Sequence, residues 1–85
     1  MYQVVIEKQV QKQLAKITPP NYNKVVSALQ DLANNPRPQG YKKLMGRQGF
    51  RIRIGDYRII YNINDNILTV FILAIGNRRD VYDSF

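Results

Sequence analysis

The chain has 85 residues and contains neither cysteine nor histidine. This composition excludes disulfides, zinc sites built on thiolates, and every catalytic pair that needs either residue. Thirteen basic residues against six acidic ones give a net charge of +7, which favours an anionic partner. We expect one small domain over residues 1–85, with no metal and no cofactor.

The N-terminal residues lack the basic segment and long apolar run of a signal peptide. The longest apolar run, residues 67–75, is about half as long as a membrane helix requires. The sequence therefore predicts a cytoplasmic protein with no membrane association.

The first half of the chain reads as a short strand followed by two helices. Residues 2–7 are rich in β-forming side chains. From Lys8, apolar residues recur at helical spacing, at Val10, Leu14 and Ile17. A lysine stripe on the same segment (Lys8, Lys12, Lys16) is interpreted as a solvated face. Thr18 is the predicted cap of a second helix, which the Pro- and Gly-rich residues 34–40 end.

The second half of the chain reads as β-structure. We expect strands over residues 41–45, 50–54, 57–63 and 67–75. Gly55-Asp56 forms a predicted type II′ hairpin turn, and residues 64–66 form a second turn. The last strand is apolar on both faces, so we place it centrally and expect Gly76 to turn the chain after it.

The Gly55-Asp56 turn fixes a register in which Arg53 faces Arg58 and Arg51 faces Ile60. Because side chains alternate along a strand, one face of this hairpin is apolar and the other carries three arginines. The apolar face holds Phe50, Ile52, Ile54, Tyr57, Ile59 and Tyr61. Like charges directly opposite each other are destabilising. The pairing of Arg53 with Arg58 is therefore not explained by the stability of the hairpin.

Basic residues are concentrated around the hairpin. Residues 36–61 contain seven basic side chains and one acidic side chain, Asp56. One interpretation is a solubilising surface that blocks edge pairing. The other is a surface that binds phosphates, for which the planar arginine fork is suited. Neighbouring tyrosines could stack on RNA bases, although Tyr57 and Tyr61 are predicted core residues; the others are Tyr41 and Tyr82.

Three segments together resemble the RelE branch of the RelE/ParE toxin superfamily. They are KKLMG at 42–46, FRIRIGDYRIIY at 50–61 and GNRRDVY at 76–82. The resemblance implies an α+β fold in which two N-terminal helices pack on a twisted, mainly antiparallel sheet, as in RelE-like microbial ribonucleases. It also implies a toxin of a type II toxin–antitoxin pair that cuts mRNA in the ribosomal A site.

The implied activity is that of a metal-independent endoribonuclease. The RNA 2′-OH attacks the adjacent phosphorus and leaves a 2′,3′-cyclic phosphate and a 5′-OH. The resemblance implies that Arg58 contacts the scissile phosphate, that Arg78 stabilises or protonates the leaving 5′-oxygen, and that Tyr82 orients the 2′-OH or aids proton transfer. We add Arg51 and Arg53 to the catalytic set, and expect RNA contacts from Lys42, Lys43, Arg47 and Arg79.

The chain departs from the best-known family member at Arg51 and Arg53, where that member has lysines. Arginine does not give up its proton in proteins. The general base is therefore open between Tyr82, a bound water and a ribosomal group. We predict slow or ribosome-dependent cleavage.

Two other functions remain open. A ParE-like toxin would inhibit DNA gyrase by binding, without catalysis, and a small RNA-binding module would bind RNA without arresting growth. The resemblance further implies a cognate antitoxin, RelB-like or from another family and often acidic. It also implies a toxin–antitoxin hetero-oligomer that binds operator DNA.

Overall fold

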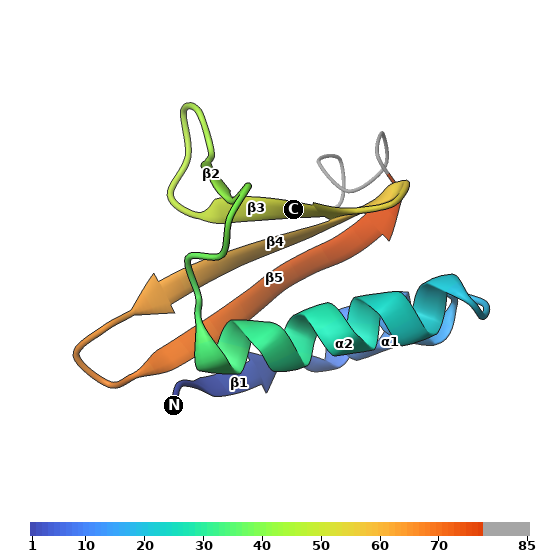
Figure 1. The fold of residues 1–85 in the computed structure, drawn as a ribbon, viewed down its shortest axis with the longest axis horizontal. Helices are drawn as coiled ribbons and strands as arrows, with labels where there is room; N and C mark the ends of the chain where they lie inside the picture. Colours follow the sequence, from blue (N-terminus) through green and yellow to red (C-terminus); the bar gives the residue numbers. More distant parts are fainter. Residues whose placement is uncertain (78–85) are drawn as a thin grey trace.

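The computed structural model describes residues 1–77, which form two helices and a five-stranded sheet (Figure 1). The helices are α1 (Lys8–Ala15) and α2 (Asn21–Asn34). The strands are β1 (Gln3–Ile6), β2 (Lys42–Lys43), β3 (Phe50–Ile54), β4 (Tyr57–Asn64) and β5 (Thr69–Asn77). Neither helix is long and apolar enough to span a membrane.

The strand order is β1-β5-β4-β3-β2. β1 runs parallel to β5, and the other neighbours are antiparallel. Helices followed by a mainly antiparallel sheet make this an α+β fold, as predicted. β5 lies inside the sheet between β1 and β4, which confirms the central position inferred from its apolar sequence.

The main core fills the space between the helices and one face of the sheet. Val10 and Ile17, from the predicted stripe, are buried, and Leu14 packs against them. The three lysines of the other stripe are exposed, as expected. From the sheet, the core receives Ile52, Ile59, Tyr61, Val70, Ile72 and Ile75. Both helices therefore cover the same side of the sheet, and neither covers the other side (Figure 1).

The predicted hairpin register is confirmed at every position. Arg53 pairs with Arg58, and Arg51 pairs with Ile60. Gly55 has φ +60°, the left-handed conformation that a type II′ turn requires at its first position. Because this register is correct, the arginines share the sheet face that the helices do not cover.

A register shift between β4 and β5 changes which side chains reach that face. Ile60 pairs with Ala74 but Tyr61 pairs with Ile72, so Leu73 is an extra residue in β5. The bulge lets Ile72 and Ile75 both enter the helix-side core. Ala74 and Ile60 are buried on the opposite face, against Leu44 and Leu73.

Several sequence-based details were wrong. The strand expected over residues 41–45 is confined to Lys42–Lys43. Thr18 does not cap α2: Pro20 precedes the helix without a side-chain cap hydrogen bond, and only the Thr18 carbonyl accepts from the Tyr22 N–H. The last strand begins at Thr69, because the Asn64 side chain accepts N–H bonds from residues 66 and 67 and holds them in the turn. Gly76 does not end the strand, since it pairs with Arg58 inside β5.

Candidate functional site

The sheet face opposite the helices, which we call the basic face, carries Arg51 and Arg53 from β3 and Arg58 from β4. Arg53 is exposed, Arg51 is half-buried, and Arg58 is only 7% exposed. Burial of a cation removes favourable hydration, so Arg58 must be held by its surroundings. A ligand therefore meets Arg53 and Arg51 first, with the charge of Arg58 behind them.

β2 extends the basic face at the edge of the sheet. Lys42 pairs directly with Arg51 and so points to the same side. Lys42, Arg51, Arg53 and Gly40 line a hollow of about 240 Å³. Three cations around one hollow suit a polyanionic ligand, because each phosphate can be contacted by more than one donor.

The other predicted RNA-binding residues are not all on this face. Lys43 pairs with Phe50, which belongs to the apolar set, so the Lys43 side chain points to the opposite side from Arg51. Arg47 is exposed in the loop between β2 and β3. Arg78, Arg79 and Tyr82 lie outside the described residues. The structure thus brings together Lys42, Arg51, Arg53 and Arg58.

A small apolar cluster beside the arginines was not among the site residues predicted from the sequence. It consists of Ile60 and Ala74, buried against Leu44 and Leu73. The predicted register already placed Ile60 opposite Arg51, and this pairing could have identified Ile60 as part of the same face. The contributions of Leu73 and Ala74 depend on the bulge in β5, which no local sequence pattern predicts.

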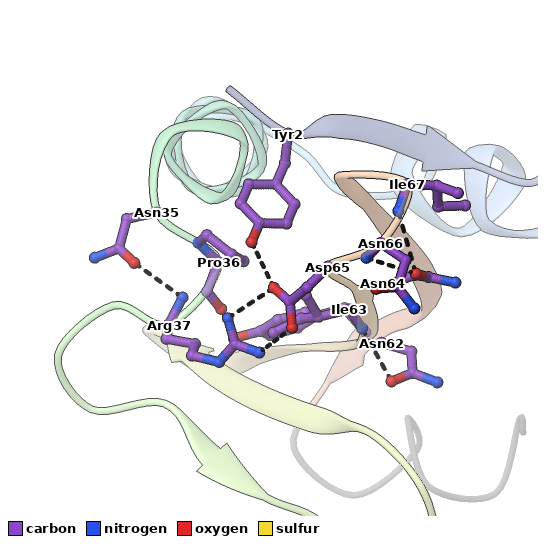
Figure 2. Close-up of polar contacts among 11 residues, drawn as sticks. Tyr2, Asn35, Pro36, Arg37, Asn62, Ile63, Asn64, Asp65, Asn66 and Ile67 are labelled. Atoms are coloured by element: carbon purple, nitrogen blue, oxygen red, sulfur yellow. Dashed lines mark hydrogen bonds and ion pairs between the residues drawn. The ribbon is translucent and has the colours of Figure 1, made fainter.

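Arg37, one of the seven basic residues in segment 36–61, does not belong to the basic face but forms an ion pair with Asp65. Its guanidinium donates to both carboxylate oxygens of Asp65, at 3.2 and 2.8 Å, and the Tyr2 hydroxyl donates to the same carboxylate (Figure 2). The hydrogen bonds from Arg37 and then Tyr2 lower the pKa of Asp65 to about 2. The hydrogen bond to Asp65 raises the pKa of Tyr2. These contacts join the N-terminus, the segment after α2 and the β4–β5 turn.

The three described tyrosines that were candidates for base stacking belong to the core side rather than to the basic face: Tyr41, Tyr57 and Tyr61. Tyr61 is fully buried, donates its hydroxyl to the Pro36 carbonyl at 2.8 Å, and has its pKa raised to about 12 by burial. Tyr57 packs against the same core, as predicted. Tyr41 also packs there, with its ring centroid 5.6 Å from that of Phe50. Stacking on RNA bases therefore has no support at Tyr41, Tyr57 or Tyr61.

Within residues 1–77, no three acidic side chains lie close enough to hold a metal ion. The basic face instead offers fixed positive charge beside a small apolar surface. Such a surface can bind the phosphates of a nucleic acid and stabilise negative charge that develops during phosphate chemistry.

Comparison with known proteins identifies the family. A family model described as the ParE toxin of type II toxin–antitoxin systems (parDE) matches residues 4–82. A toxin RelE1 of Methanocaldococcus jannaschii is 31% identical over 85 residues, covering 95% of this chain and 94% of that protein. This chain belongs to the RelE/ParE family of toxins of type II toxin–antitoxin systems.

Solved structures agree with this assignment of a RelE-like toxin. The RelE–RelB complex of Pyrococcus horikoshii OT3 matches with a TM-score of 0.81 and 32% identity, over 92% of this chain and 96% of the matched chain. The RelBE2 toxin–antitoxin complex of Mycobacterium tuberculosis matches with a TM-score of 0.77 and 32% identity, over 91% and 98%. Both the fold and the family inferred from the three sequence segments are confirmed.

Proposed function

We propose that this RelE-like toxin is a ribosome-dependent mRNA endoribonuclease. The observation that carries the proposal is the pairing of Arg53 with Arg58, beside Arg51, on the sheet face that the helices leave uncovered. Like charges held face to face weaken a sheet by about 0.2–1 kcal/mol per pair. A polyanion bound at Arg51 and Arg53 would counter the repulsion among these cations.

The proposed chemistry is attack of the substrate 2′-OH on the adjacent phosphorus. The new O–P bond forms as the bond to the 5′-oxygen breaks, which gives a 2′,3′-cyclic phosphate and a 5′-OH. Because RNA supplies its own nucleophile, the protein must mainly orient the backbone and stabilise the extra negative charge. Arg51 and Arg53 would hold the phosphate. Arg58, which is buried on the same face, would add positive charge beneath them.

Other roles in this proposal come from the family resemblance. Contact between Arg58 and the scissile phosphate requires neighbouring side chains to part, because Arg58 is 7% exposed. Arg78 would stabilise or protonate the leaving 5′-oxygen, which becomes the 5′-OH, and Tyr82 would orient the 2′-OH or aid proton transfer, with Arg79 adding an RNA contact. The four arginines of the catalytic set cannot act as a base, so proton removal falls to Tyr82, water or the ribosome.

We also propose that the toxin is held by an acidic antitoxin. A net charge of +7 attracts an acidic partner and speeds its association. The two solved relatives described above were crystallised with RelB-type antitoxins. Binding of operator DNA by the resulting hetero-oligomer is part of the same proposal.

A second candidate is inhibition of DNA gyrase without catalysis. It is favoured by the matching family model, whose description names the ParE toxin. Since the RelE and ParE branches share the scaffold, the fold does not separate the two functions.

The deciding experiment uses purified toxin in two parallel assays. We expect ribosomes stalled with a defined A-site codon to yield mRNA cut in that codon, with 5′-OH ends, and gyrase to keep supercoiling DNA. Loss of supercoiling with intact mRNA would support the ParE-like function instead. Rapid cutting of naked RNA would contradict ribosome dependence.

A further inference from the structure

The outer edge of β3 is covered by β2 over only part of its length. β2 pairs with β3 at two positions, Lys42 with Arg51 and Lys43 with Phe50. In the same register, Gly40 would face Arg53. The chain instead turns away there: Gly40 has φ +91°, and the Tyr41 N–H donates to the Pro38 carbonyl. Within residues 1–77, no strand continues along residues 52–54 of β3.

Two hollows flank this open edge, one on each face of the sheet. The hollow on the basic face is about 240 Å³ and is lined by Lys42, Arg51 and Arg53. The hollow on the helix side is about 290 Å³, and its walls include Ala28, Leu32, Ile52 and Ile54. Gly40 and Arg53 border both hollows, so the two hollows lie next to each other at this edge.

This arrangement matches what an added β-strand needs. Successive side chains of a strand point to opposite faces, about 3.3 Å apart along the chain. A segment paired with residues 52–54 would therefore place one side chain in the basic hollow and the next in the apolar hollow. Backbone hydrogen bonds to an edge strand provide affinity, and the alternating pockets provide specificity.

The chemistry of the two hollows selects the sequence of the added strand. The three cations on one side favour Asp or Glu. The aliphatic walls on the other side favour Val, Ile or Leu, and the Asp31 carboxylate at the rim of that hollow disfavours a second acid there. The preferred occupant is a strand in which acidic and aliphatic residues alternate.

We propose that the outer edge of β3, at residues 52–54, is a β-addition site for such a segment of the cognate antitoxin. The inference rests on the proposed antitoxin partnership and does not require catalysis. An acid in the basic hollow would neutralise Arg51 and Arg53, so the same segment would exclude RNA from the basic face.

The test uses synthetic peptides and the full-length toxin. The probe is a capped peptide of about eight residues in which Glu alternates with Val. Its control has the same composition, with all Glu residues preceding all Val residues. We expect the alternating peptide to slow amide hydrogen exchange at residues 52–54 but not in β1, and to bind about tenfold more tightly than the control.

A charge reversal tests the orientation of the strand. Arg53 is exposed, so Arg53→Glu should fold normally by circular dichroism. This variant should bind the Glu–Val peptide about tenfold more weakly and gain affinity for a Lys–Val peptide. Lys12→Glu, the matched reversal on α1, should bind like the wild type.

Equal binding of both peptides, or no protection at residues 52–54, would overturn the inference. A short RNA that protects these amides when the peptide does not would assign the edge to nucleic acid, and would overturn it as well. Peptide binding by a toxin that fails to cut mRNA would leave the inference standing and contradict only the proposed nuclease function.

Discussion

At the scale of single residues, Arg37 shows why a local count of charges is an incomplete guide to a binding face. Arg37 lies in the basic segment 36–61, yet its guanidinium forms a bidentate ion pair with Asp65, 28 positions along the chain (Figure 2). The pair is about half-exposed, so its main effect is positional. It holds the segment that leads from α2 to β2.

Asp65 gives a prediction for acid stability. Its pKa of about 2 lies below the ordinary value of 3.8 because Arg37 and Tyr2 hydrogen-bond to the ionised form. A lowered pKa stabilises the folded state above the ordinary pKa, and the contribution disappears as the pH falls towards 2. Urea denaturation between pH 7 and pH 2 should show that Asp65→Asn lacks this component of acid destabilisation.

The control for this prediction is the matching variant Arg37→Gln. The double variant should show the same pH dependence as Asp65→Asn alone, because the ion pair is already broken. A wild-type pH profile in Asp65→Asn would show that the ion pair does not contribute to folding in solution.

At the scale of elements, the β3–β4 hairpin is the part that the sequence determines most completely. Alternation of apolar and arginine residues, together with Gly55 at the turn, led to the register that the structure has. Each cue is local, and all of them agree, so no long-range information was needed. The opposite orientation of Lys43 follows from the β2 register, which no turn residue specifies.

The hairpin also predicts how RNA binding depends on salt. If Lys42, Arg51 and Arg53 neutralise three phosphates, the logarithm of the affinity for a short single-stranded RNA should fall against the logarithm of salt concentration with a slope of about −2. Arg53→Ala should make that slope shallower by about 0.7. Fluorescence anisotropy over a salt series measures both values.

Lys12→Ala is the control for the salt series, because Lys12 lies on the exposed stripe of α1. It should leave the slope unchanged. Equal reductions for Arg53→Ala and Lys12→Ala would mean that RNA senses only the overall charge, and not the basic face.

At the scale of the whole molecule, the fold class and the central position of β5 could be inferred from the sequence, while several connections could not. The parallel pairing of β1 with β5 joins residues more than 60 positions apart. The bulge that brings Leu73 and Ala74 to the basic face leaves no signature in an apolar run. Long-range packing decides both features, and local patterns do not record it.

At the same scale, we propose that the arginines of the sheet face opposite the helices hold the RNA backbone while it is cut. The most direct measurement is mapping of mRNA 5′-ends after induction in cells, for the wild type, Arg53→Ala and Lys12→Ala. We predict new 5′-OH ends within translated regions for the wild type and Lys12→Ala, and about 100-fold fewer for Arg53→Ala, with growth restored. Growth arrest without new ends, or undiminished cutting by Arg53→Ala, would contradict the claim.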